Sequence, residues 1–237
     1  MKKKAVILSP IMPLWDDGRF CLDIQNLLLK NDIDFTILDT PSLLKGVPKE
    51  DNLALVEEEI KRRFNFPILL IGFSMAGTLA QMLAYRLANV EAVISLSGPG
   101  YADDVLKKHI GALLLLLEDG ALCDALELLH RYAQPVDTSV PLGNILIPEE
   151  QKAEALDRMK NGFKLLLEMD ARTVIGKFKG KFLSLVGAKS QLATVKNQTA
   201  SVLEYHEYHT IKNAGARLWR DDPTIVGDII NSWIKKI

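Results

Sequence analysis

The sequence predicts an α/β protein with a doubly wound, mostly parallel sheet that is interrupted once by a helical insertion. Short apolar runs alternate with stretches of helical periodicity over residues 1–100, and the alternation resumes over residues 180–237. Such alternation is typical of parallel strands that are joined by helices. Residues 101–179 are helical in period. We therefore expect a core domain of residues 1–100 and 180–237 and a helical cap, or lid, of residues 101–179.

Four strands and three helices are predicted before the insertion. The strands are short, and the first, Ala5–Leu8, is continuously apolar, as in a strand that is buried on both faces of a parallel sheet. The helices repeat apolar residues at spacings of three and four, which places these residues on one face. The strands are expected at Ala5–Leu8, Ile33–Leu38, Ile68–Ile71 and Ala92–Leu96, and the helices at Phe20–Lys30, Leu53–Phe64 and Met75–Leu87.

The insertion and the last part of the chain complete the pattern. Leucine-rich helices are expected in the insertion at Val105–Leu117, Ala121–Tyr132 and Glu149–Asp170. After it we expect a strand at Lys181–Gly187, a helix at Thr194–Leu203 and a strand within Tyr205–Ile211. Asp222 followed by Pro223 is typical of a helix start. The last helix is expected to align Ile225, Ile229, Trp233 and Ile237 on one stripe.

The composition argues against several classes of function. Lys and Arg number 29 and Asp and Glu 30, a net charge of −1, which favours neither nucleic acid nor an anionic membrane surface as partner. Cys21 and Cys123 have neither metal-site nor disulfide spacing, so a cytoplasmic location is expected. The apolar runs at residues 5–8 and 113–117 are too short for a signal peptide or a membrane span. We expect no cofactor and no metal, and the oligomeric state stays open.

The functional analysis centres on Gly72-Phe73-Ser74-Met75-Ala76-Gly77, which stands between a predicted strand and a predicted helix. This is the sequence form of a nucleophile elbow, a sharp strand-to-helix turn with a serine at its apex. Small residues on either side of the serine let the two backbones approach each other. Ser74 is therefore the candidate nucleophile, and a serine at a turn without chemistry is the alternative.

These features resemble the α/β-hydrolase superfamily over nearly the whole chain. The resemblance rests on the elbow, on the helical insertion after Val93-Ile94-Ser95-Leu96-Ser97-Gly98, and on the ending Asn213-Ala214-Gly215 with Trp219 and Asp222-Pro223. More narrowly, the chain resembles capped esterases, thioesterases and carbon–carbon hydrolases. The resemblance implies the α/β-hydrolase fold and a triad in which serine attacks a carbonyl, histidine takes its proton and an acid orients the imidazole.

Only one of the three triad positions carries the residue that the resemblance implies. Ser74 matches the nucleophile. Ser190 stands where the family's acid is expected, and Ala216 stands where its histidine is expected. Asp103 is an alternative acid, because some members carry theirs after the strand next to the nucleophile's. An acid without a base does not activate a serine, so a fast esterase is not expected.

The four histidines offer no clear substitute for the missing base. His209 lies seven residues before Ala216 in a segment that is predicted to be extended, which separates the two by roughly 23 Å. His206 is farther away along the chain. His109 and His130 lie in the predicted cap, and the sequence leaves open whether either reaches Ser74.

The resemblance also implies an oxyanion hole and a substrate pocket. Its donors are expected to be the backbone N–H groups of Met75 and Ile11, because the prolines in the first loop have no N–H to offer. Met12 and Trp15 in the same loop are expected to line the pocket, and simple packing is the alternative for Trp15.

Two explanations of Ala216 stay open at this point. One is the engineered removal of the base from a serine hydrolase. The other is natural divergence toward a cyclase, lyase or epimerase, which Ser190 favours because a designed knockout seldom removes two residues. The expected partner is a small acyl ester, thioester or carbonyl compound. The alternative function is a non-catalytic ligand-binding or scaffold protein of the same fold.

Overall fold

The computed structural model describes residues 3–141, 143 and 145–237. In that part of the chain a single six-stranded sheet has the order β2-β1-β3-β4-β5-β6, and every neighbouring pair is parallel. The strands are β1 (Lys4–Leu8), β2 (Asp34–Leu38), β3 (Ile68–Phe73), β4 (Val90–Leu96), β5 (Lys181–Gly187) and β6 (His206–Ile211). The predicted parallel, doubly wound sheet is confirmed.

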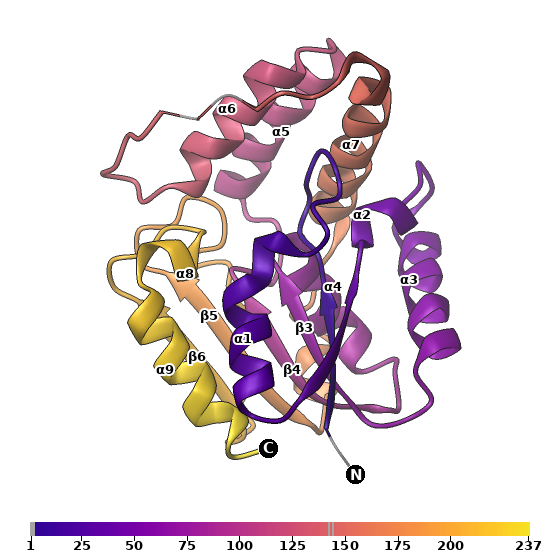
Figure 1. Cartoon of the computed structure of the whole chain (residues 1–237), viewed down its shortest axis with the longest axis vertical. Helices are drawn as coiled ribbons and strands as arrows, with labels where there is room; N and C mark the ends of the chain where they lie inside the picture. The colour runs from indigo at the N-terminus through magenta and orange to yellow at the C-terminus, as the bar shows by residue number, and fades with distance from the viewer. Residues whose placement is uncertain (1–2, 142, 144) are drawn as a thin grey trace.

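Helices cover both faces of this sheet and extend beyond its carboxyl edge (Figure 1). The α-helices are α1 (Leu22–Lys30), α2 (Thr40–Leu43), α3 (Lys49–Arg63), α4 (Met75–Ala84), α5 (Asp104–Glu118), α6 (Leu122–Ala133), α7 (Lys152–Glu168), α8 (Leu218–Asp221) and α9 (Pro223–Ile234). Single 3-10 turns lie at Arg19–Cys21, Glu149–Gln151 and Ile175–Lys177.

The strands divide the core into two buried clusters, one on each face of the sheet. Val6 and Leu8 of β1 pack with α3 and α4, whereas Ala5 and Ile7 pack with α1 and α9 on the opposite face. Neighbouring residues of a strand point to opposite faces, so a continuously apolar strand supplies both clusters. This explains why β1 is apolar at each of residues 5–8.

Three helices, α5 to α7, separate β4 from β5 in the chain and lie beyond the carboxyl ends of the strands in Figure 1. Their buried residues, among them Leu106, Leu113 and Phe163, belong to the same cluster as Leu79 and Leu83 of α4. The inserted helices therefore share one continuous core with a face of the sheet.

Helix α7 is tied to the loop that follows β1. The guanidinium of Arg158 donates to both carboxylate oxygens of Asp39, at 2.7 and 2.8 Å, and its Nε donates to the carbonyl oxygen of Met12 at 3.3 Å. Ile11 packs so closely on the same helix that a Cβ on Gly162 would lie 2.6 Å from its Cγ1. The first loop is thus held in place by an inserted helix.

The helix predicted at residues 194–203 is wrong, because this segment consists of turns and irregular chain. The buried side chain of Asn197 accepts a hydrogen bond from the backbone N–H of Thr194 at 2.7 Å and donates one to the carbonyl of Leu192 at 2.9 Å. An asparagine that satisfies nearby backbone groups in this way competes with the helical ladder. Contacts with the rest of the fold decide whether this segment forms a helix or irregular chain.

The predicted stripe on the last helix is wrong at Ile225, whereas Trp233 is buried and Ile229 and Ile237 pack against the same cluster. Ile225 is 48% exposed, and the buried residues of α9 are Val226, Ile230, Trp233 and Ile234. Steps of four residues overshoot a helical turn by about 40° each, so a strict four-residue pattern drifts off the packed face. The predicted helix start is confirmed, since the Asp222 side chain accepts from the Ile225 N–H at 3.3 Å.

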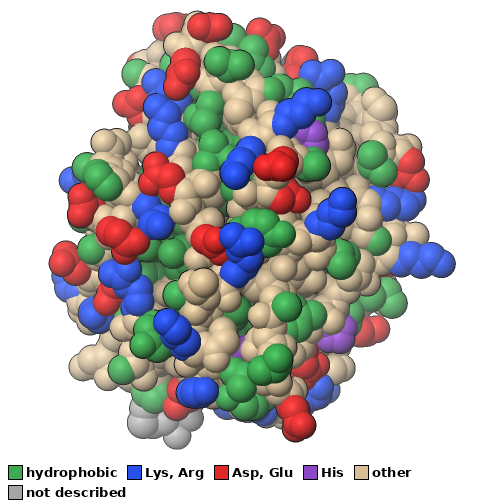
Figure 2. All heavy atoms as spheres, turned by 180° about the vertical axis from the view of Figure 1, so that it is seen from behind, with side chains coloured by type: hydrophobic (Ala, Val, Ile, Leu, Met, Phe, Trp, Pro, Cys, Tyr) green, Lys and Arg blue, Asp and Glu red, His purple; other side chains and the backbone are tan. Residues whose placement is uncertain are grey.

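Charges are dispersed over the face of the molecule seen in Figure 2. Acidic and basic side chains alternate there with apolar ones and do not gather by sign. Within the described residues, none of the helices is both long and apolar enough to span a bilayer.

A buried histidine in β6 predicts that acid weakens the fold. His206 packs against the rings of Phe182 and Tyr205, with centroids 5.4 and 5.2 Å away, and burial lowers its pKa below the ordinary value. The unfolded chain therefore binds a proton more readily, so the free energy of unfolding falls as the pH drops below about 6.5. We expect His206→Phe to make this fall shallower in denaturant titrations between pH 5 and 8, and an unchanged slope would contradict it.

Candidate active site

The candidate site lies where the strand order reverses. The chain leaves β1 for α1 on one face of the sheet and leaves β3 for α4 on the other face. In open parallel sheets this divergence opens a crevice at the carboxyl ends of the two strands, where ligands bind. Ile11 follows β1 and Ser74 follows β3, so both stand at this crevice.

Ser74 occupies a strained turn between β3 and α4. Its backbone has φ 52° and ψ −123°, a conformation that residues with a side chain rarely adopt. Two hydrogen bonds hold it there: the Ser74 N–H donates to the carbonyl of Leu96 at 2.8 Å, and the Gly77 N–H donates to the carbonyl of Ser74 at 2.8 Å. The turn thereby presents the serine at the end of the strand instead of inside the helix.

The turn requires glycine at position 72. A Cβ there would lie 2.0 Å from the carbonyl oxygen of Ala76 and 2.7 Å from the N–H nitrogen of Gly77. Both contacts are with backbone, so they cannot be relieved by rotating a side chain. The close approach that the sequence pattern implies is present.

We expect Gly72→Ala to destabilise the protein by about 1–3 kcal/mol, the usual cost of forcing an extra carbon into a packed site. Gly111→Ala is the matched control, because nothing lies within 4 Å of its added Cβ in the middle of α5. There alanine should stabilise by about 0.5–1 kcal/mol. Urea denaturation of the two variants measures both effects, and equal stability would show that the turn tolerates a side chain.

Ser74 opens onto a cavity of about 510 Å³ at the carboxyl edge of the sheet. The other lining residues come from the first loop and the start of α1, from the ends of β3 and β4, from helix α6 and from the segments after β5 and β6: Pro10, Ile11, Phe20, Asp23, Phe73, Leu96, Ser97, Leu129, Ala133, Leu192, Ala216, Arg217, Leu218, Trp219 and Arg220. A smaller space of about 30 Å³ lies between Ser74 and the inserted helices. The larger cavity has the size of a small-molecule site.

Ala216 lines the cavity with Ser74, so the position where the resemblance implies histidine lies at the site. Its N–H donates to the carbonyl of Ala133 at 3.1 Å, and its carbonyl accepts from the hydroxyl of Ser97 at 2.7 Å. Ser97, like Ser74, has a φ of 52°. Ser74 and Ser97, which follow the neighbouring strands β3 and β4, thus both have a strained backbone. Sequence analysis identified only Ser74.

Ser190, at the position of the family's acid, lies in the turn after β5 and is absent from the lining of the cavity. Its hydroxyl oxygen accepts from the N–H of Leu192 at 3.3 Å. The neighbouring Lys189 N–H donates to the carbonyl of Ala214 at 3.0 Å. The loops after β5 and β6 are therefore in direct contact, and Ser190 and Ala216 lie in adjacent segments.

The alternative acid, Asp103, is engaged in helix capping. Its Oδ1 accepts from the N–H of Leu106 at 2.9 Å at the start of α5 and from the side-chain amide of Asn197 at 3.5 Å. It does not line either cavity at Ser74.

All four histidines lie within the described residues, and none lines the cavities at Ser74. His109 Nδ1 is 3.0 Å from the carbonyl oxygen of Gln191, and its ring stacks on Tyr132. His130 Nε2 is 2.9 Å from the carbonyl oxygen of Val140, and burial lowers its pKa. These contacts hold the two histidines of the insertion away from the serine.

The first loop contributes unevenly to the cavity. Ile11 lines both spaces at Ser74, and Met75 begins α4 directly after the serine. Met12 and Trp15 are not among the lining residues: Met12 accepts from Arg158, and the ring of Trp15 lies 6.4 Å from that of Phe20, which lines the cavity. Trp15 thus packs on Phe20, a lining residue, and does not line the cavity itself.

Sequence analysis missed the arginines of the site. Arg217 and Arg220 line the cavity with Ser74. Burial and the neighbouring charge of Arg220 lower the pKa of Arg217. The only signal in the sequence is that Arg217 directly follows the position of the family's histidine.

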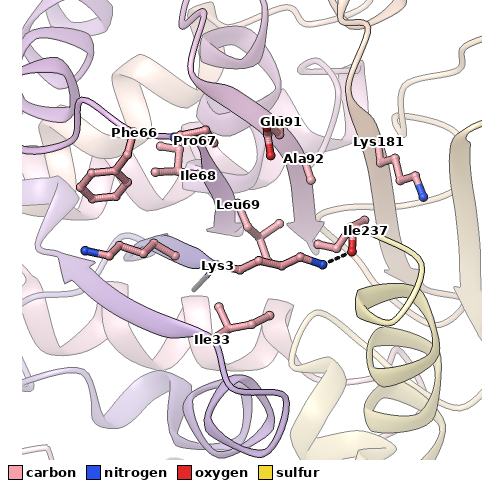
Figure 3. A pocket seen from close by; sticks show the side chains of 11 residues that line it. Lys3, Ile33, Phe66, Pro67, Ile68, Leu69, Glu91, Ala92, Lys181 and Ile237 are labelled. Carbon is pink, nitrogen blue, oxygen red and sulfur yellow. Dashed lines mark hydrogen bonds between the residues drawn. The ribbon is translucent and has the colours of Figure 1, made fainter. Parts of the chain in front are cut away.

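Another cavity, of about 540 Å³, lies at the opposite end of the sheet (Figure 3). Its apolar lining includes Phe66, Ile68 and Leu69, and its polar groups are mostly lysines. Lys3 Nζ donates to the carbonyl oxygen of Ile237, as drawn in Figure 3, and Lys4 Nζ lies 4.3 Å from the ring centre of Phe66. Because Lys3 and Lys4 are engaged in these contacts and no strained nucleophile lines this cavity, it is the weaker candidate for a functional site.

Among the described residues there is no group of three or more His, Cys, Asp or Glu side chains that would hold a metal ion. The polar side chains that line the cavity are those of Ser74, Ser97, Asp23, Arg217, Trp219 and Arg220.

No model of a known protein family and no curated protein matches this chain. Solved structures match it over almost its full length. MGS-M2, an α/β hydrolase enzyme from a Medee basin deep-sea metagenome library, aligns with a TM-score of 0.74 and 11% identity, covering 99% of this chain and 90% of that one.

Two further matches have similar statistics. Bromoperoxidase from Bacillus anthracis aligns with a TM-score of 0.74 and 15% identity, covering 99% of this chain and 92% of its own. A lipase-esterase related protein from Clostridium acetobutylicum ATCC 824 aligns with a TM-score of 0.68 and 18% identity, covering 98% and 94%. With the sheet order and these full-length alignments in agreement, the chain has the α/β-hydrolase fold.

Proposed function

We propose that the cavity binds a small acyl ester, thioester or carbonyl compound, and that Ser74 acts on it as nucleophile or hydrogen-bond donor. The observation that carries this proposal is the strained Ser74 turn, with φ 52°, at the edge of a cavity of about 510 Å³. Backbone strain persists where the surrounding structure holds it, and such sites are frequently functional.

In the proposed reaction the Ser74 hydroxyl adds to the carbonyl carbon of the substrate. The negative charge that develops on the carbonyl oxygen is stabilised by the N–H groups of Met75 and Ile11. Collapse of this intermediate expels the alcohol or thiol and leaves an acyl-serine, which water then hydrolyses. The serine proton must reach the expelled alcohol or thiol, and water has to carry it because Ala216 has no side chain that accepts it.

The absence of that acceptor limits the rate in this chain. Removing the histidine of a serine triad lowers turnover by about 10⁶, and the oxyanion hole and binding leave about 10³–10⁴ over water. We therefore infer either a hydrolase whose base has been replaced or a diverged cyclase, lyase or epimerase. In the second case a basic group of the substrate takes the proton.

Residues 101–179 serve in this proposal as a cap over the site. Leu106, Ile110 and Leu129 line the spaces at Ser74 together with Phe163 and Leu166 of α7. Apolar side chains over a serine exclude water and strengthen each electrostatic interaction beneath them.

A non-catalytic, ligand-binding protein is the second candidate. The observation that favours it is the pair Ser190 and Ala216, since both altered triad positions lack acid-base chemistry. A fluorophosphonate probe separates the two, because it reacts covalently only with an activated serine. Mass spectrometry of the labelled chain and of Ser74→Ala locates the adduct. Adduct formation at Ser74 supports the catalytic proposal, whereas its absence in this chain and in Ala216→His supports the binding protein.

A further inference from the structure

We propose that Arg217 and Arg220 bind an oxyanion, a carboxylate or phosphate, that the ligand carries in addition to its carbonyl group. This inference rests on the proposed function insofar as it places the carbonyl group at Ser74. It names the chemical class of the ligand, an apolar acyl compound with one anionic end.

The two arginines belong to the cavity and not to the outer surface alone. Both line it together with Ser74, and Arg217 is half-buried directly after Ala216. They lie at either end of a single turn, since the N–H of Arg220 donates to the carbonyl of Arg217 at 3.0 Å. Two guanidinium groups thus approach one space from one short segment.

The described part of the chain provides no direct counter-ion for Arg217. No described carboxylate lies within 4.0 Å of its guanidinium. Asp221 is close enough to influence it, but its carboxylate accepts from the N–H of Gly215 at 2.8 Å. Asp23 also lines the cavity and is exposed. Arg217 is half-buried and Arg220 is exposed, and their like charges repel each other, so a bound oxyanion stabilises this arrangement.

The other residues that line the cavity determine the chemistry of the rest of the ligand. Phe20, Phe73, Leu129, Leu192 and Trp219 surround the cavity with apolar surface. Guanidinium groups match the planar geometry of carboxylates and the oxygens of phosphates through paired hydrogen bonds. The ligand therefore combines an apolar chain with one anionic end, as in the half-ester or half-thioester of a dicarboxylic acid.

Equilibrium binding of three probes to the full chain tests this inference. Monomethyl adipate carries an ester and a carboxylate, dimethyl adipate is its neutral counterpart, and hexyl phosphate carries a phosphate. By calorimetry we expect monomethyl adipate to bind at least about 10-fold more tightly than dimethyl adipate, with the difference lost in Arg217→Gln and reduced in Arg220→Gln. Arg62→Gln, an exposed arginine of α3 paired with Glu59, removes the same charge and should preserve the preference.

Each outcome decides the inference. Tighter binding of hexyl phosphate, with the same dependence on Arg217, supports the oxyanion site and identifies phosphate as its ligand. Equal binding of charged and neutral probes, a preference that survives Arg217→Gln, or no binding of any probe overturns it. These measurements need no reaction at Ser74. Their outcome is therefore independent of the fluorophosphonate labelling that tests the proposed function.

Discussion

Ala216→His is expected to raise the rate of fluorophosphonate labelling at Ser74, and of ester hydrolysis, by about 10². Ala216 lines the same cavity as Ser74, so an imidazole at this position has space beside the hydroxyl. In a serine triad the loss of histidine lowers turnover by about 2 × 10⁶ and the loss of the acid alone by about 3 × 10⁴. The ratio of these two figures is the gain that a histidine supplies without its acid.

Ser190→Asp in the Ala216→His background is expected to add up to about 10⁴, because an acid orients the imidazole and stabilises its charged form. Ser190→Asp alone should have no effect, since an acid needs the histidine in order to act. The rates are measured with a chromogenic acetate ester.

Two controls make the comparison specific. Ala216→Asn introduces a polar side chain without a base and should leave the rate unchanged. Ser74→Ala in the Ala216→His background should abolish the gain. A gain that persists without Ser74, or no gain in either histidine variant of a folded protein, would reject Ser74 as the nucleophile.

Asp39→Asn is expected to destabilise the protein by about 3–5 kcal/mol. Asp39 holds the guanidinium of Arg158 through two hydrogen bonds of 2.7 and 2.8 Å, and the two side chains are only 19% and 5% exposed. Removing one partner of a buried pair leaves the other charge without compensation. Because Arg158 also contacts the carbonyl of Met12, the first loop and Ile11 should loosen as well. Urea denaturation measures the loss of stability.

The double variant Asp39→Leu with Arg158→Met tests the cause of that loss. Apolar residues of similar volume often replace a buried ion pair at little cost, so the double variant should be more stable than Asp39→Asn. Glu59→Gln, which removes the partner of the exposed Arg62 and Arg63 side chains of α3, should shift the denaturation midpoint much less, because solvent screens both arginines. If Asp39→Asn and Glu59→Gln lower the free energy of unfolding equally, the Asp39–Arg158 pair contributes no more to stability than the ion pairs of Glu59.

Local sequence signals were sufficient wherever one segment determines its own conformation. The apolar runs predict five of the six strands within two residues at each end, because the inner strands of a parallel sheet are buried on both faces and are therefore apolar. Gly72 and Ser74 predict the strained turn, because the approach of Ala76 to Gly72 is a contact between near neighbours in the chain. Where the side chain of Asn197 competes for backbone hydrogen bonds, the same local signals predict a helix that is not formed.

Contacts between distant segments could not be predicted in this way. Arg158 and Asp39 are 119 residues apart, and each by itself is typical of a solvent-exposed position. Arg217 likewise has the sequence context of a charged surface turn. Only the return of the chain after β6 to the end of β3 places it in the cavity with Ser74.

The sequence by itself determined the fold class and the turn at Ser74, because both depend on residue type and local spacing. Only the tertiary structure decided that Ala216 shares a cavity with Ser74, that His109 and His130 are held elsewhere by backbone carbonyls, and that two arginines line the site. The physical reason is that burial and charge depend on which segments meet in space. Those meetings follow from the strand order, which local patterns do not specify.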